Sequence, residues 1–106
     1  MSHQSEIRAI RNLVAYRGGF CYAHSQRAFK DKGRWHIAVT PGLPDLYIQF
    51  PSRRLVFWME VKTGVGRLRP AQAEFKAASD AAGVPVVVGD LEHLIAFLNS
   101  RGIECH

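Results

Sequence analysis

Three ionisable residues, Asp45, Glu60 and Lys62, lie at one end of two apolar-rich segments, 46–50 and 55–61. The segments are separated by a short polar turn, and this pattern predicts a β-hairpin. A four-residue loop sets a register in which Asp45 faces Glu60, and alternation places Lys62 on the same face. Carboxylates placed about 5 Å apart repel each other, whereas a hard divalent cation prefers such oxygen ligands. The pattern therefore predicts a site for metal-assisted phosphodiester hydrolysis, in which Lys62 holds a water or a phosphate oxygen.

The two faces of the predicted hairpin differ in character. Successive side chains point to opposite faces of a strand, so the residues of both segments separate into two sets. The apolar set is Leu46, Ile48, Phe50, Leu55, Phe57, Met59 and Val61. The set on the other face, called the polar set because it contains the ionisable residues, is Asp45, Tyr47, Gln49, Val56, Trp58, Glu60 and Lys62. The ordinary alternative explanation for its charged residues is a Glu–Lys pair on a solvated strand face.

Length and composition indicate a single globular domain, residues 1–106, of which 47% is hydrophobic. No apolar run approaches the roughly 20 residues that cross a bilayer, and the N-terminus lacks the apolar segment of a signal peptide. We therefore expect a cytoplasmic protein without membrane contact. The two cysteines and five histidines have no metal-binding spacing and are expected to be ordinary surface or core residues.

The charge balance suggests a polyanionic partner. The chain has 14 lysines and arginines against nine acids, and its formal net charge is +5. A basic surface around an acidic pocket suits a nucleic acid, because cations hold the phosphates while the reacting phosphate lies at the metal. Charge alone does not decide the matter, because many soluble proteins are basic.

The first part of the chain predicts an amphipathic helix over 5–17. Its apolar stripe has helical spacing, and Ser2 or Ser5 would cap its N-terminus. Glu6 borders the stripe, where it either stabilises the dipole of its own helix or points into the site. The stripe consists of Ile7, Ile10, Leu13 and Val14.

A strand is expected over 20–25, followed by a loop over 26–40 in which cations alternate with Phe29 and Trp35. Cations with aromatic rings suit a loop that contacts nucleic acid, and a solvated loop is an equally good explanation. A second basic segment, 63–69, contains two glycines and lacks the ending of a Walker loop. The candidate nucleic-acid-binding residues are Arg27, Lys30, Lys32, Arg34, Arg67 and Arg69.

The last third of the chain predicts a helix over 71–82, a buried strand over 84–89 and a helix from Asp90 to about 102. One helix connects the strands 55–62 and 84–89, so these strands should be parallel. Gln72 falls on the helix face that packs on the sheet, and a buried amide needs partners. The hydrogen-bond partner of the Gln72 amide is expected to be either the carboxylate cluster or a loop carbonyl. The resulting order is α-β-β-β-α-β-α.

Short motifs then identify a family resemblance that covers roughly residues 5 to 99. The chain resembles the PD-(D/E)XK nuclease superfamily, and within it the short, stand-alone, phage-type form of the VRR-NUC branch. The motif residues are Gly42, Pro44 and Asp45; Glu60, Val61, Lys62 and Thr63; Gly66, Arg67 and Leu68; Pro70 and Gln72; and Gly83, Pro85 and Val86.

The resemblance implies an α/β fold with a restriction-endonuclease-like core, in the order α-β-β-β-α-β with a C-terminal helix and a mixed central sheet. It implies that Asp45, Glu60 and the Val61 carbonyl bind Mg²⁺ or Mn²⁺. Lys62 would orient the attacking water or stabilise charge on the phosphate, and Gln72 and Glu6 would complete the catalytic set. It further implies a homodimeric nuclease of DNA recombination and repair that cuts four-way (Holliday) junctions, in the cytoplasm of a bacterium or a phage-infected cell.

Two other functions stay open at this stage. The chain could be a non-catalytic basic DNA-binding module, although such a module has no use for two opposed carboxylates. It could also be a PD-(D/E)XK nuclease that acts on duplex, flap or RNA substrates. The sequence does not specify the number of metal ions.

Overall fold

The structure is a computed structural model that describes residues 2–23, 28–37, 40–64 and 66–105. The described residues form an α/β fold with a four-stranded mixed sheet in the order β1-β4-β5-β6 and a separate two-stranded sheet, β2-β3. Strands β4 and β5 are antiparallel, and β5 and β6 are parallel as predicted. The elements are α1 (His3–Tyr16), β1 (Phe20–Ala23), β2 (Ala28–Asp31), β3 (Arg34–Ile37), β4 (Leu46–Phe50), the 3₁₀ turn η1 (Pro51–Arg53), β5 (Leu55–Val61), α2 (Pro70–Ala81), β6 (Val86–Gly89) and α3 (Leu91–Ser100).

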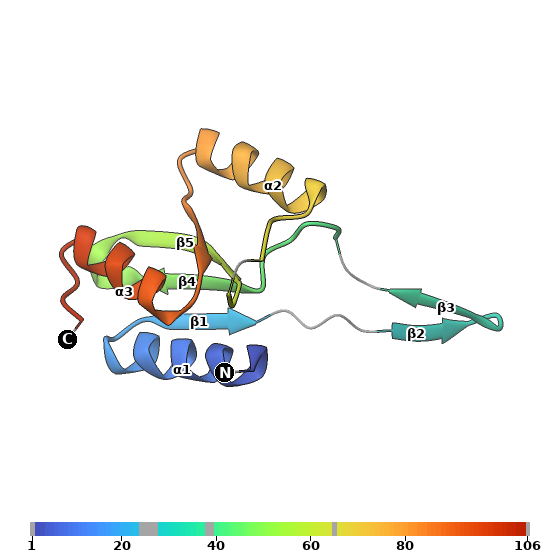
Figure 1. The fold of residues 1–106 in the computed structure, drawn as a ribbon, viewed down its shortest axis with the longest axis horizontal. Helices are drawn as coiled ribbons and strands as arrows, with labels where there is room; N and C mark the ends of the chain where they lie inside the picture. The colour runs from blue at the N-terminus through green and yellow to red at the C-terminus, as the bar shows by residue number, and fades with distance from the viewer. Residues whose placement is uncertain (1, 24–27, 38–39, 65, 106) are drawn as a thin grey trace.

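The four-stranded sheet lies between two layers of helices (Figure 1). Helices α1 and α3 cover one face, where their buried side chains join the core cluster. Helix α2 covers part of the other face, and its Phe75 ring packs edge-on against Trp58 of β5. No residue of α2 is fully buried, so this helix covers its face of the sheet less completely.

The predicted register of the central hairpin is confirmed. Phe50 pairs with Leu55, and Ile48 with Phe57. The same register, continued one step beyond β4, brings Asp45 opposite Glu60, although Asp45 itself lies in the bend before the strand. The turn is a single 3₁₀ turn that ends at Arg54 in a left-handed conformation.

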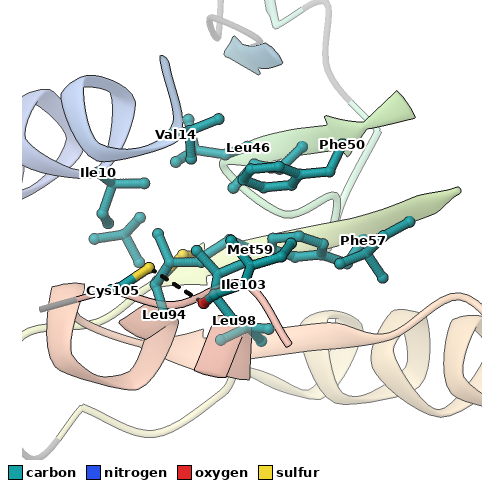
Figure 2. Close-up of a cluster of buried hydrophobic side chains, with 14 residues drawn as sticks. Ile10, Val14, Leu46, Phe50, Phe57, Met59, Leu94, Leu98, Ile103 and Cys105 are labelled. Atoms are coloured by element: carbon teal, nitrogen blue, oxygen red, sulfur yellow. Dashed lines mark hydrogen bonds between the residues drawn. The ribbon is translucent and has the colours of Figure 1, made fainter. Parts of the chain in front are cut away.

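The core consists of the apolar hairpin face and the two helices that cover it (Figure 2). Every residue of the predicted apolar set is buried, which confirms that this face packs inward. The other members of the cluster are Ile10 and Val14 of α1, Val87 of β6, Leu94 and Leu98 of α3, and Ile103 and Cys105 after α3. Because the core occupies one face, the polar set is left on the face toward α2.

Local capping signals explain where the helices begin. Helix α1 begins after Ser2, whose hydroxyl accepts a hydrogen bond from the Ser5 amide. Helix α2 begins at Pro70. Proline suits the first helical position, because the backbone N–H that proline lacks would have no partner within the helix there. Asp90 caps α3 by accepting from the His93 amide. No helix among the described residues is long and apolar enough to cross a membrane.

The expectation of a loop over 26–40 is wrong for the part of this segment that the structure describes. Strands β2 and β3 form a hairpin that projects from the core (Figure 1). The two central turn residues, Lys32 and Gly33, have φ values of 51° and 77°. Two positive φ angles are the requirement of the type I′ turn that joins hairpin strands, and lysine is an unusual residue there. The hairpin signal was therefore weak in the sequence.

Gly42 allows the loop before β4 to pack closely against α2. Gly42 has a φ of 82°, and a Cβ built on it would overlap the carbonyl group of Ala71 in the first turn of α2. Only glycine allows both this backbone conformation and this close approach. The contact holds the segment before Asp45 beside the beginning of α2, where Gln72 lies.

We expect Gly42→Ala to lower the free energy of unfolding by about 2–4 kcal/mol, through left-handed backbone strain and overlap with Ala71. Chemical denaturation measures the change. Gly83→Ala is the matched control, because Gly83 also has a positive φ but has open space around its Cβ position. It should lose only the backbone component, about 1 kcal/mol. Equal losses in both variants would show that the close approach contributes nothing.

Candidate functional site

A cleft of about 950 Å³ opens at the end of the sheet where β5 ends and β4 begins. One wall is the exposed side of α1, and the opposite wall is the beginning of α2. The segment 40–43 and Ala23 at the end of β1 complete the rim. Asp45, Glu60 and Gln72, three of the predicted site residues, line this cleft. The end of the predicted polar hairpin face, at Asp45 and Glu60, thus opens into the cleft.

The Asp45 carboxylate is fixed by a backbone amide and a histidine. Its Oδ2 accepts a hydrogen bond of 2.9 Å from the Val61 amide at the end of β5. The same oxygen lies 3.5 Å from Nε2 of His3 in the first turn of α1. The bond to Val61 ties the residue before β4 to the end of β5. Because Glu60 directly precedes Val61, this bond holds the Asp45 carboxylate beside the Glu60 carboxylate.

Glu60 is a buried carboxylate that also lines the cleft. Burial is the main cause that raises the pKa of Glu60, and the Asp45 carboxylate raises it further. Lys62 lowers this pKa in part, because its Nζ lies 3.8 Å from Oε1 of Glu60. The same Oε1 accepts a 2.8 Å hydrogen bond from Nε2 of Gln72. The Asp45 and Glu60 carboxylates thus repel each other. This repulsion and the burial of Glu60 both disfavour the charged form of Glu60.

Gln72 connects the beginning of α2 to the acid pair. Its Nε2 donates to Glu60, while its Oε1 accepts a 2.8 Å hydrogen bond from the Arg69 amide. The predicted contact with the carboxylate cluster is therefore present, and the same side chain also caps its own helix. Both bonds fix the amide orientation, because the donor end must face Glu60 and the acceptor end must face Arg69.

Glu6 makes a contact that neither sequence interpretation included. It is buried, and its Oε1 accepts a 2.7 Å hydrogen bond from the amide of Leu91, the first residue of α3. A carboxylate at that position stabilises the N-terminus of α3 rather than that of its own helix. Glu6 does not line the cleft. Its participation in catalysis remains a prediction.

The candidate nucleic-acid-binding residues fall into two groups. Lys30, Lys32 and Arg34 are exposed on the β2–β3 hairpin. Arg67 and Arg69 are exposed before α2, and Arg69 lines the cleft. Lys62 does not line the cleft, but its Nζ lies 3.8 Å from Oε1 of Glu60, which does. Arg27 lies outside the described residues.

The structure adds residues of α1 that the sequence analysis missed. Arg8 and Arg11 line the cleft opposite Arg69, and His3, which was expected to be an ordinary residue, lies beside Asp45. A signal for the arginines was available, because residues 4, 8 and 11 have the spacing of one helix face. That signal could not show which element the exposed face of α1 adjoins.

The cleft offers two side-chain ligands for a cation. No three His, Cys, Asp or Glu side chains converge on one point within the described part of the chain. Asp45 and Glu60 nevertheless form a pair of oxygen donors, which fits Mg²⁺, because this ion is usually bound through one or two carboxylates with several waters and substrate phosphates. Val61, whose carbonyl is the third predicted ligand, follows Glu60 directly. The donor chemistry therefore fits the predicted metal, and the repulsion between the acids would be relieved by it.

A comparison of the chain with protein-family models found no match, and a comparison with curated proteins found no significant similarity. The VRR-NUC assignment therefore remains a prediction that depends on the motif residues.

We expect Glu60→Gln to raise the melting temperature of the metal-free protein by a few degrees at pH 7. The raised pKa means that the folded state binds a proton more tightly than the unfolded state, whose glutamate has a pKa of about 4.3. The stability that Glu60 contributes is therefore complete below about pH 4 and is lost as pH rises through the folded pKa. The gain in melting temperature of Glu60→Gln over the native chain should be complete above the folded-state pKa of Glu60 and should vanish in acid. Thermal unfolding in EDTA between pH 3 and 8 measures it.

Glu74→Gln is the matched control, since Glu74 is an exposed acid of α2. It should leave the melting temperature unchanged across the same pH range. If Glu60→Gln melts below the native chain at neutral pH, the attraction to Lys62 outweighs burial and Asp45, and Glu60 is not a strained acid.

Proposed function

We propose that the protein is a Mg²⁺- or Mn²⁺-dependent DNA endonuclease that hydrolyses phosphodiester bonds at the Asp45–Glu60 pair. The single observation that supports this proposal most strongly is the pair itself. A buried acid with a raised pKa lies beside a second acid on the lining of a large cleft. Such an arrangement is unfavourable for folding, and strained groups of this kind concentrate at functional sites.

The acid pair and the residues in contact with it have separate roles in this proposal. Asp45 and Glu60, with the Val61 carbonyl, would hold the metal, which supplies Lewis acidity toward a phosphate oxygen and an activated water. Gln72 positions Glu60 by a hydrogen bond to Oε1. Lys62, on the same carboxylate, keeps a positive charge near the position where negative charge develops on the phosphate.

The substrate class follows from the charges around the acids. Arg8 and Arg11 on one wall and Arg69 on the other surround the acidic floor with cations. Cationic walls hold the neighbouring phosphates of a polyanion while one phosphate lies over the carboxylates. A site for a small neutral substrate would not need cations on both walls.

The proposed family is the VRR-NUC branch of the PD-(D/E)XK superfamily. Support comes from the motif residues, from the α/β fold with its mixed sheet, and from the contact between Gln72 and Glu60. The β2–β3 hairpin is an addition to the order expected for that core.

A homodimer that cuts four-way junctions is the proposed form of the activity. A C₂ dimer brings two equivalent sites together, and a four-way junction requires two symmetric cuts. Two surfaces are candidates for such a contact, helix α1 and the edge strand β1, and both have exposed aromatic side chains. Tyr16 of α1 is 81% exposed, and Phe20 and Tyr22 of the edge strand β1 are each 54% exposed. Phe20 and Tyr22 lie two residues apart, on the same face of their strand, and adjacent exposed apolar side chains are typical of interaction surfaces. Tyr16 is a single exposed side chain, which is ordinary on a protein surface.

We expect Asp45→Asn and Glu60→Gln each to abolish cleavage while DNA binding stays equal or becomes tighter, because each change removes negative charge beside the phosphates. Added Mn²⁺ should raise the melting temperature of the native chain but not of these variants. Lys62→Ala should keep this metal-dependent stabilisation and lose about 10²- to 10⁴-fold in cleavage rate. Gln72→Ala should lose about 10- to 100-fold, as expected for a residue that orients a ligand.

The assay should include junction, flap, linear duplex and RNA substrates with Mg²⁺, Mn²⁺ or EDTA. Full activity of Asp45→Asn or Glu60→Gln would refute the site. Binding without cleavage of any substrate by the native chain would instead identify a non-catalytic DNA-binding module.

We expect light scattering to show a dimer at micromolar concentration and opposed cuts in a four-way junction in preference to linear duplex. Tyr16→Lys and the double variant Phe20→Lys/Tyr22→Lys test the two surfaces separately, since these exposed side chains can be changed without disturbing the core. The variant that becomes monomeric identifies the interface and should lose paired cutting. A monomeric native chain with equal cleavage of linear and branched DNA would leave the nuclease proposal standing and exclude the dimeric one.

A further inference from the structure

The β2–β3 hairpin leaves the core at the rim of the cleft. The chain segments on both sides of it, Ala23 and Thr40 to Leu43, line the cleft. Figure 1 shows the hairpin projecting away from the sheet at the end where α1 and α2 begin, and the molecule measures 50 × 30 × 30 Å along its principal axes. A nucleic acid bound across the cleft would therefore pass close to the hairpin.

Three cations are distributed over the whole hairpin. Lys32 lies in the turn, Lys30 lies on β2, and Arg34 begins β3 as the backbone partner of Asp31. Because successive strand residues point to opposite faces, Lys30 and Arg34 occupy opposite faces. All three cations are exposed. A ribbon that lay flat on a charged surface would need cations on one face only, whereas this ribbon has them on both faces and at its tip.

The lysine in the turn is an unfavourable choice for folding. Its φ of 51° lies in the left-handed region, where hairpin turns strongly prefer asparagine, aspartate or glycine. This conformation places an ammonium group at the most distant point of the ribbon. Residues held in rare backbone conformations often serve a function.

We infer that the β2–β3 hairpin is a DNA-binding arm whose tip enters the major groove of duplex DNA next to the cleft. A two-stranded ribbon with its side chains is about 10 Å across, which fits a major groove about 12 Å wide and not a minor groove about 6 Å wide. Phosphates line both sides of the groove, which matches cations on both faces. A-form RNA would be rejected, because its major groove is too narrow.

This inference relies on the proposed function only for the choice of DNA as the partner. The test uses the Asp45→Asn protein, which is not expected to cut, and a 30-base-pair linear duplex. Lys30→Gln/Lys32→Asn/Arg34→Gln in that background should bind at least tenfold more weakly at low salt. Its slope of log affinity against log salt should become shallower by about 0.9 for each phosphate that the variant no longer neutralises. Circular dichroism and thermal unfolding confirm that the variant is folded.

Two single variants separate charge from folding at the tip. Lys32→Asn suits the turn better and removes the charge, so it should fold at least as well and bind DNA more weakly. Lys32→Arg keeps both the charge and the unfavourable turn residue, so it should bind as the parent does. If Lys32→Asn binds as tightly as Lys32→Arg, the lysine has no role in DNA contact.

The groove is tested with a duplex that carries glucosylated hydroxymethylcytosine, which fills the major groove, and with netropsin, which fills the minor groove. The modified duplex should weaken binding of the Asp45→Asn parent and not of the triple variant, and netropsin should have no differential effect. The inference is overturned if the parent binds no duplex, if the triple variant binds as the parent does, or if only netropsin discriminates them. If the native chain needs the hairpin for DNA binding but cleaves no DNA, the nuclease proposal is refuted and the inference of a DNA-binding arm is retained.

Discussion

The repulsion between two neighbouring carboxylates is the constraint on which the rest of the site depends. Asp45 and Glu60 face each other across the end of the central hairpin, and Glu60 is buried with a raised pKa. Placing a second carboxylate beside a buried one is unfavourable, and a fold retains such a pair only where surrounding groups hold it in place. The contacts around the pair can be understood as the means by which the chain tolerates it.

Those contacts come from three elements that meet at this end of the sheet. Helix α1 contributes His3, β5 contributes the Val61 amide, and α2 contributes Gln72. Gly42 allows the loop before β4 to approach α2 closely enough for this convergence. Glu6, although directed to α3, fastens the first turn of α1 to the same end of the sheet. The site is thus a junction of several elements, so its geometry depends on the whole fold.

The central part of this arrangement could be predicted from the sequence, because it depends on local periodicity. Alternation over 46–61 and the length of the turn determine the strand register and therefore the opposition of Asp45 and Glu60. Helical spacing placed Gln72 on the face toward the sheet. These inferences needed only residues close in sequence or related by a simple hairpin.

The features that could not be predicted depend on contacts between distant elements or on rare backbone conformations. The bond from Leu91 to Glu6 joins residues 85 positions apart, and no local pattern indicates it. Arg8 and Arg11 were visible as an exposed helix face, but their place in the cleft required the packing of α1. The β2–β3 hairpin was missed because its turn uses a lysine where asparagine or glycine is the usual signal.

Location of the metal would test the central claim most directly. Crystals of the protein soaked in millimolar Mn²⁺ should show an anomalous difference peak between the Asp45 and Glu60 carboxylates, within bonding distance of both and of the Val61 carbonyl. Crystals of Asp45→Asn treated in the same way should show no peak there. A native crystal without density at the acid pair, or with Mn²⁺ bound only elsewhere, would contradict the assignment of this pair as a metal site.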